Sequence, residues 1–82
     1  MKKITIYTTN VCPYCVRAKA LLNKKNYEYE EINVENEQDR NLMIEKANGK
    51  RSVPQIFIED YHVGGCDELY ELDRDGKLEG LI

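Results

Sequence analysis

The sequence of this 82-residue chain predicts a single α/β domain: a four-stranded mixed sheet with helices on both faces. Two observations carry this prediction. Short β-type runs alternate with segments of helical spacing in the order β-α-β-α-β-β-α. The last two strands are separated by only two residues, which indicates an antiparallel hairpin, whereas strands joined through a helix are expected to be parallel. No repeat, linker or low-complexity stretch divides residues 1–82.

The first half of the chain is expected to form a strand, a helix and a second strand. The first strand covers residues 3–8, where apolar and polar side chains alternate. The helix follows over about 13–25, and Asn26 is a suitable residue to end it. In the second strand, over 27–34, the alternation changes phase. Either a β-bulge or a half-exposed edge strand would explain that change.

A second helix is expected over residues 37–47. Acidic residues stand early in this segment, and Gly49 follows its end. The helical spacing predicts that Leu42, Met43 and Ala47 face the core.

The remaining elements are shorter. Strands are expected at 55–58 and 61–63, joined by Glu59-Asp60 in a hairpin. A helix should span about 66–74, and a turn or short helix around Leu78 should close the chain.

Composition and charge exclude several function classes. The net charge is −3 and the basic residues are scattered among acidic ones, so we expect no nucleic-acid binding. No secretory signal or transmembrane segment is recognisable, so we expect a cytoplasmic protein without a membrane partner. In a reducing compartment, a close pair of cysteines is more often catalytic or metal-binding than structural.

The segment Cys12-Pro13-Tyr14-Cys15 lies where a strand gives way to a helix. Proline suits the first helical position, which makes Cys12 the N-cap. Unpaired N–H groups and the helix dipole at this end stabilise a thiolate. We therefore expect Cys12 to be an exposed nucleophile with a pKa depressed into the range of about 3.5–7.5, and Cys15 to be the less reactive resolving thiol.

A metal site is the alternative interpretation of the same residues. Cys12, Cys15, His62 and Cys66 would suffice for tetrahedral zinc. The spacing of the last two, across two glycines, is unlike a second zinc knuckle.

The chain resembles the dithiol glutaredoxins over nearly its full length. Three segments carry the resemblance: Cys12-Pro13-Tyr14-Cys15, Ser52-Val53-Pro54-Gln55-Ile56-Phe57-Ile58 and Gly64-Gly65-Cys66-Asp67. The resemblance implies a thioredoxin-like fold and a glutathione-dependent thiol-disulfide oxidoreductase. Such an enzyme reduces glutathione mixed disulfides and protein disulfides, with glutathione as cosubstrate and no metal or prosthetic group. Its partners would be glutathione and glutathionylated or disulfide-containing proteins, and we expect a monomer.

The resemblance also implies a glutathione site. It places a cis peptide bond between Val53 and Pro54, which would expose the Val53 backbone to an extended peptide. The glycines and the helix start that follows them would receive the γ-glutamyl end. The implied binding residues are Thr9, Tyr14, Asn41, Arg51, Val53, Pro54, Gly65, Cys66 and Asp67.

Thr9 departs from the family pattern, which commonly has lysine three residues before the first cysteine. The departure removes a cation expected to assist both the thiolate and the glycine carboxylate of glutathione. We therefore expect weaker glutathione binding than in a lysine-bearing relative, with Arg51 making most of the carboxylate contact.

Two other functions stay open on the sequence. One is a thioredoxin-type reductase that does not depend on glutathione. The other is a metal-binding module, either the zinc site above or a dimer that bridges an iron–sulfur cluster through Cys12 and glutathione.

Overall fold

The computed structural model describes residues 2–82, which form one sheet and four helices. The element order agrees with the sequence prediction, and a fourth short helix closes the chain. In chain order the elements are β1 (Ile4–Thr8), α1 (Pro13–Lys24), β2 (Glu30–Asn33), α2 (Glu37–Lys46), β3 (Gln55–Ile58), β4 (Tyr61–Gly64), α3 (Cys66–Arg74) and α4 (Leu78–Leu81).

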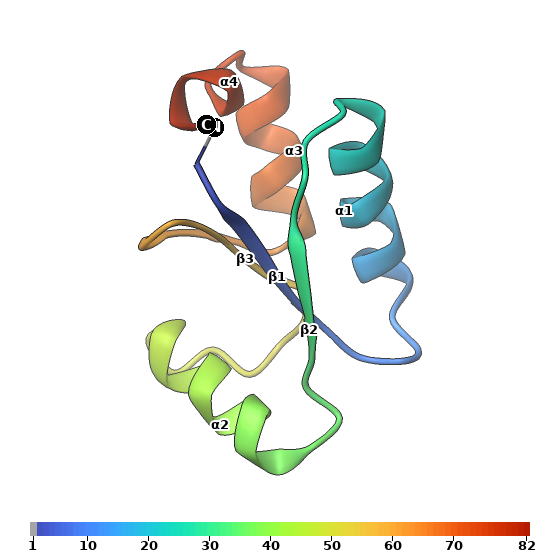
Figure 1. Ribbon diagram of the computed structural model, residues 1–82, viewed down its shortest axis with the longest axis vertical. Helices are drawn as coiled ribbons and strands as arrows, with labels where there is room; N and C mark the ends of the chain where they lie inside the picture. Colours follow the sequence, from blue (N-terminus) through green and yellow to red (C-terminus); the bar gives the residue numbers. More distant parts are fainter. Residues whose placement is uncertain (1) are drawn as a thin grey trace.

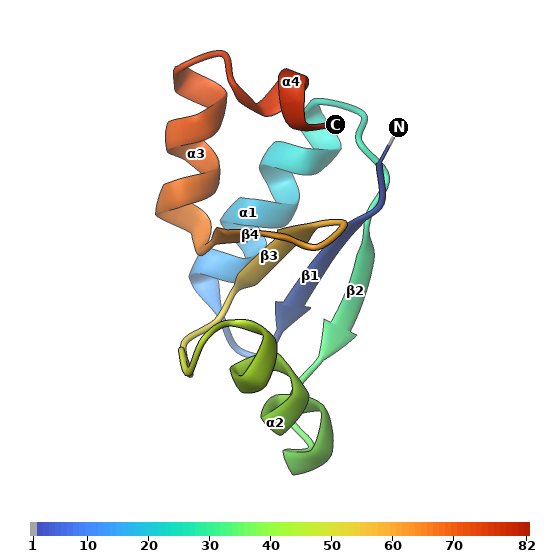
Figure 2. The same ribbon diagram turned by 90° about the vertical axis from the view of Figure 1, so that its left-hand side faces the viewer.

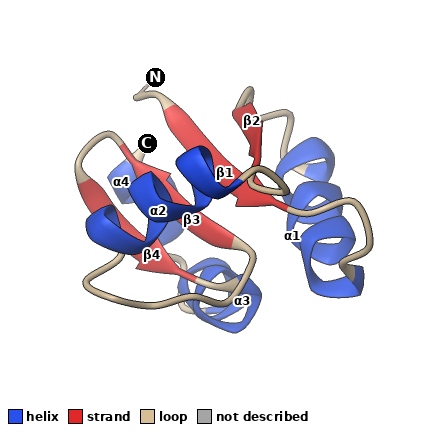
Figure 3. Ribbon diagram, turned by 90° about the horizontal axis from the view of Figure 1, so that it is seen from below, coloured by secondary structure: helices blue, strands red, loops and turns tan. Residues whose placement is uncertain are grey.

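The sheet is mixed, with the strand order β2-β1-β3-β4. β1 pairs in parallel with β2, and β3 pairs antiparallel with both β1 and β4. Helices α1 and α3 lie on one face of the sheet, whereas α2 lies on the other (Figures 1 and 2). Figure 3 shows the same arrangement from below. The predicted fold class is therefore confirmed.

Each face of the sheet has its own core, because successive side chains of a strand point to opposite faces. Ile4 and Ile6 of β1 join the larger core beneath α1, α3 and α4, whereas Tyr7 joins the smaller core beneath α2. The buried residues of the smaller core are Tyr7, Val34, Met43, Ala47 and Phe57.

Strand β2 is an edge strand and is mostly exposed. Tyr27 and Tyr29, which precede it, pack against the larger core, whereas Ile32 and Val34 belong to the smaller one. The alternation changes phase because the apolar side chains before β2 pack in the larger core and the later ones pack in the smaller core. Of the two explanations offered by the sequence, the half-exposed edge strand is the one observed.

Helix α2 corrects one expectation. Met43 and Ala47 are buried as predicted, but Leu42 is 49% exposed. Ile44 packs against the smaller core instead. The inward stripe of this helix runs through Met43, Ile44 and Ala47, and Leu42 precedes it by about 100° of helical rotation.

None of the helices within residues 2–82 is both long enough and apolar enough to cross a membrane.

Candidate active site

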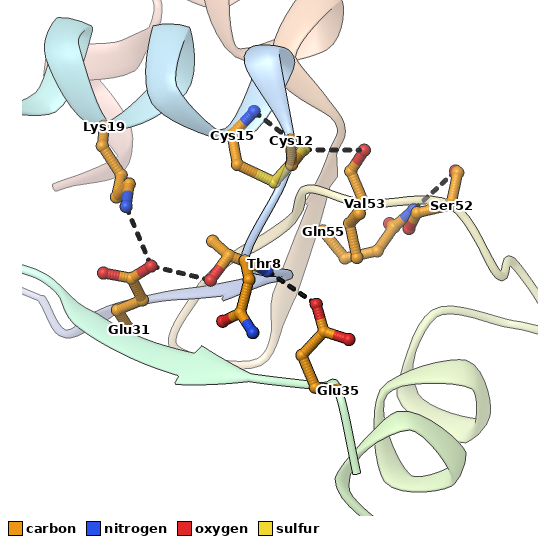
Figure 4. The surroundings of a disulfide bond; sticks show 10 residues. Thr8, Cys12, Cys15, Lys19, Glu31, Glu35, Ser52, Val53 and Gln55 are labelled. Atoms are coloured by element: carbon orange, nitrogen blue, oxygen red, sulfur yellow. Dashed lines mark hydrogen bonds and ion pairs between the residues drawn. A yellow bond between two sulfur atoms is a disulfide. The ribbon is translucent and has the colours of Figure 1, made fainter. Parts of the chain in front are cut away.

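Cys12 and Cys15 stand at the N-terminal end of α1 and form a disulfide, with their Cα atoms 5.2 Å apart (Figure 4). Cys12 is the N-cap residue in an extended conformation, and Pro13 begins the helix. The backbone N–H of Cys15 points at the Cys12 Sγ atom, with an N–S distance of 3.1 Å. The cap position predicted for Cys12 is confirmed, and its sulfur takes the place of the oxygen that usually caps a helix.

The two sulfurs differ in access. Cys15 is only 1% exposed and faces the body of the protein, whereas Cys12 is half-buried. An incoming thiolate can therefore reach the Cys12 side of the disulfide more easily than the Cys15 side.

The loop before β3 lies opposite Cys12. The carbonyl oxygen of Val53 is 3.8 Å from the Cys12 Sγ atom. The peptide bond between Val53 and Pro54 is cis, as the resemblance implies. Figure 4 shows this loop beside the disulfide.

A groove of about 190 Å³ lies between this loop and the start of α3. Six of its lining residues are among the binding residues expected from the sequence, and they come from three separate segments. The groove is lined by Tyr14, Ser52, Val53, Pro54, Gly65, Cys66, Asp67 and Glu68.

Ser52 and Glu68 were not singled out from the sequence. Ser52 lies next to Val53 in a segment that was already identified, so its position was the available signal. Glu68 stands three residues after the helix cap, where an acidic residue typically bonds back to the cap backbone.

Three expected binding residues do not line this groove. Arg51 is exposed and immediately precedes the groove residue Ser52. Asn41 is exposed on α2, and Thr9 is half-buried in the loop before Cys12.

The start of α3 is built around the Glu68 carboxylate. Its Oε1 atom accepts a hydrogen bond from the N–H of Gly65 at 2.6 Å. A side chain at Gly64 would bring its Cβ within 2.9 Å of the same oxygen, and a Cβ at Gly65 would lie 3.4 Å from the Pro54 carbonyl oxygen. The two glycines therefore leave room for the Glu68 carboxylate, which a Cβ at Gly65 would also approach at 3.2 Å.

Cys66, the third cysteine, is a free thiol that is only 4% exposed. Burial raises the pKa of the Cys66 thiol, an effect that the nearby charge of Arg17 opposes in part. This thiol is therefore a weaker nucleophile than an exposed cysteine.

The four residues considered for zinc do not come together. His62 bonds through Nε2 to the Oε1 atom of Gln55, at 2.7 Å, and its ring stacks on Phe57. Within residues 2–82, no three His, Cys, Asp or Glu side chains are grouped so that they could hold a metal ion.

Acidic side chains from β2 and the segment after it support the loop that carries Cys12. Glu31 accepts hydrogen bonds from the Thr8 hydroxyl at 2.7 Å and from the Lys19 ammonium group at 2.9 Å. These two bonds hold the pKa of the Glu31 carboxyl below its usual value. Glu35 accepts a hydrogen bond from the backbone N–H of Asn10 at 2.8 Å. Figure 4 shows both carboxylates beneath the disulfide.

Comparison with known proteins agrees with this geometry. The glutaredoxin family model matches residues 4–63. Glutaredoxin 1 of Rickettsia typhi is 54% identical over 96% of this chain and 78% of its own length. The solution structure of glutaredoxin from Brucella melitensis has a TM-score of 0.86 and is 49% identical, covering 99% of this chain and 88% of that one. A buckwheat glutaredoxin–glutathione complex has a TM-score of 0.84 and is 33% identical, covering 95% of this chain and 74% of that one.

The family match, the thioredoxin-like fold and the Cys12–Cys15 pair lead to the same assignment. The chain belongs to the glutaredoxin family, whose members are thiol-disulfide oxidoreductases that use glutathione as cosubstrate.

Proposed function

We propose that this glutaredoxin reduces glutathione mixed disulfides through Cys12 alone and protein disulfides through Cys12 and Cys15 together. One observation supports this proposal above the others. Val53 lines the groove, and its carbonyl oxygen lies 3.8 Å from the Cys12 sulfur. A peptide that pairs with the Val53 backbone would thus have its cysteine beside the nucleophile.

The first reaction needs only the outer sulfur. The Cys12 thiolate attacks the glutathione sulfur of a mixed disulfide, and the target leaves as a thiolate that takes up a proton. A glutathione thiolate then attacks the same glutathione sulfur in the Cys12 adduct. Oxidised glutathione leaves, and the Cys12 thiolate is restored. The N–H of Cys15 points at the Cys12 sulfur in the disulfide form, and the same N–H would stabilise the negative charge of the Cys12 thiolate.

The second reaction adds the buried thiol. The Cys12 thiolate attacks one sulfur of a protein disulfide and forms a mixed disulfide with that cysteine, while the other target cysteine leaves as a thiolate and takes up a proton. The Cys15 thiolate then attacks the Cys12 sulfur, the target cysteine bound to Cys12 leaves as a thiolate, and the Cys12–Cys15 disulfide forms. Two glutathione molecules then reduce it, first forming the Cys12 adduct and then releasing oxidised glutathione.

The groove residues are proposed to divide the tripeptide among them. The Val53 backbone would pair with its central residue, and the α3 N-terminus at Cys66 and Asp67 would receive the γ-glutamyl carboxylate. Tyr14 and Pro54 would supply apolar contact. Arg51, with Thr9 and Asn41, is proposed for the glycine carboxylate, and the flexible arginine side chain would have to extend from beside the groove.

The proposed partners are glutathione and glutathionylated or disulfide-containing proteins. The enzyme is proposed to act as a monomer in the cytoplasm. A reducing compartment suits this cycle, because it keeps the dithiol available between turnovers. We propose no metal or prosthetic group for the reaction.

Steady-state kinetics with a glutathionylated peptide, glutathione and glutathione reductase test the proposal. Cys12→Ser should abolish turnover, whereas Cys15→Ser should retain deglutathionylation and lose reduction of protein disulfides. Turnover by Cys12→Ser would contradict the mechanism. Turnover driven by thioredoxin reductase without glutathione would favour the thioredoxin-type alternative.

A further inference from the structure

We propose that Gln55 and His62 are positioning residues. Through a chain of hydrogen bonds they hold the loop before β3, residues 52–54, which is proposed to bind glutathione. This inference rests on the proposed function, because it assigns these side chains the task of shaping the site around Val53.

Gln55 forms the central part of the chain. It is the first residue of β3 and is only 2% exposed. Its Nε2 atom donates to the carbonyl oxygen of Ser52 at 2.9 Å and approaches the Ser52 hydroxyl at 3.2 Å. Ser52 lines the groove and directly precedes Val53 (Figure 4). A buried amide therefore holds the loop at Ser52, the residue that precedes Val53 and its cis bond to Pro54.

His62 fixes the other end of that amide. Because the Ser52 carbonyl can only accept, the Gln55 nitrogen must face it and the Gln55 oxygen must face His62. The His62 Nε2 atom lies 2.7 Å from that oxygen and therefore carries a proton. Burial and the charge of Lys50 lower the pKa of His62, so the neutral Nε2–H tautomer is the form at neutral pH.

The sheet orients the His62 ring. His62 on β4 is paired with Phe57 on β3, and the two rings stack with centroids 4.7 Å apart and planes 20° apart. The pairing of β3 with β4 and the stacking on Phe57 thus direct the ring at Gln55, and Gln55 directs its amide at the loop. Turning the amide over would leave buried polar atoms unpaired, which is costly.

The consequence for catalysis concerns binding and not chemistry. The hydrogen-bond chain from His62 through Gln55 to Ser52 supports the neighbouring Val53 backbone, and none of these hydrogen bonds involves a cysteine sulfur. A contact made equally in the substrate complex and the transition state affects KM and leaves kcat unchanged when it is lost.

Gln55→Met tests this, because methionine keeps the length of the side chain and removes both polar ends. The substrates are one peptide carrying a mixed disulfide with either glutathione or 2-mercaptoethanol. We expect the KM for the glutathionylated peptide to rise about tenfold, as for the loss of one to two hydrogen bonds. Its kcat should not change, nor should kcat/KM for the 2-mercaptoethanol peptide.

Two substitutions of His62 separate the hydrogen bond from the ring. His62→Phe keeps an aromatic ring on Phe57 and removes the donor, so the KM should rise about threefold, as for a weaker single bond. His62→Gln supplies an amide N–H and should restore the wild-type KM. Val34→Ala is the stability control: it opens the smaller core, should lower the Tm, and should leave the preference for glutathione unchanged.

The outcomes distinguish this inference from the proposed function. If the wild-type protein does not prefer the glutathionylated peptide, the proposed function fails. If it does and Gln55→Met keeps the same preference, only the positioning role is overturned. An equal fall in kcat/KM for both peptides would also overturn the positioning role, because the substitution would then impair the enzyme with either substrate. His62→Phe provides the same test if Gln55→Met does not fold.

Discussion

Cys12 and Cys15 share a disulfide, but their surroundings differ. The Cys12 sulfur is the cap of α1 and lies beside Val53, whereas Cys15 is one turn further and buried. The helix start therefore places a capped, accessible sulfur and a buried sulfur within four residues, as the proposed attacking and resolving roles require. The position of the pair on the helix, more than its spacing, is what distinguishes the two sulfurs in the proposed mechanism.

The Cys66 thiol should be unreactive in the folded protein. We expect iodoacetamide at neutral pH to alkylate Cys12 first in the reduced protein and to leave Cys66 unmodified, because Cys66 is buried and its pKa is raised. Mass spectrometry of digested peptides measures this. Denatured protein is the control and should be labelled at Cys66. Labelling of Cys66 as fast as Cys12 in the native state would contradict the prediction.

Thr9→Lys should strengthen glutathione binding. A new cation before Cys12 is expected to attract the glycine carboxylate, and an exposed pair of this kind is worth at most about 1 kcal/mol, or about a fivefold fall in the KM for glutathione. Thr9→Gln, which is long but neutral, is the matched control. An unchanged KM in Thr9→Lys would show that Thr9 lies away from the carboxylate.

At the scale of elements, the start of α3 depends on two glycines and one acid. Glu68 bonds back to the N–H of Gly65, but glycine has no side chain to complete the reciprocal half of a capping box. No side chain at the cap position therefore bonds to the first backbone N–H groups of α3, which lie beside the groove. The residues that cap this helix are also those that line the groove.

Gly64→Ala should destabilise the protein more than Gly76→Ala. Both glycines have positive φ values, 115° and 73°, so each substitution carries backbone strain of about 1 kcal/mol or more. Only at Gly64 would the new Cβ also meet the Glu68 carboxylate, because nothing lies within 4 Å at Gly76. Thermal unfolding of the two variants measures the difference. Equal losses in Tm would mean that the Glu68 side chain moves away without cost.

At the scale of the whole molecule, Glu31 links three elements. Its carboxylate on β2 receives the Thr8 hydroxyl at the end of β1 and the ammonium group of Lys19 on α1. The carboxylate thus ties the edge strand to the centre of the sheet and to the helix that carries the active cysteines.

The Glu31 carboxylate should stabilise the folded protein at a pH above the pKa that Glu31 has in the unfolded chain. It should give no stabilisation at a pH below its pKa in the folded protein. Its folded pKa is lowered, so its contribution is complete at neutral pH and is lost as the pH falls below about 4.5 through the folded value. The side chain is 39% exposed, so we expect less than about 1 kcal/mol. Urea unfolding of Glu31→Gln at pH 7 and pH 3 measures this. Glu30→Gln is the matched control, since its partner Lys3 lies on the surface. A deficit in Glu31→Gln that persists undiminished at pH 3 would contradict the prediction.

The sequence predicted the fold, the cap role of Cys12 and most of the groove, because these features follow from local rules. Cys12 precedes a proline at a helix start, and the glycines precede an acidic helix start. It did not predict that Leu42 would be exposed, because neighbouring helical positions differ by only one step of rotation. Nor did it predict that Gln55 joins Ser52 to His62 or that Glu31 joins Thr8 to Lys19. The contacts of Gln55 with His62 and of Glu31 with Thr8 depend on strand register, and that of Glu31 with Lys19 depends on how α1 packs on the sheet; residue spacing encodes neither.

Strand β2 also bears on how the protein behaves at high concentration. It forms one margin of the sheet, so its outer backbone groups have no neighbouring strand. Such a margin is a template on which a second molecule could add its own strand and begin to aggregate. Here it is only four residues long and begins with Glu30 and Glu31. Two molecules that met edge to edge would therefore bring like charges together. Glu31, which binds Lys19 on the active-site helix, is therefore also one of the two acids expected to disfavour self-association at this edge.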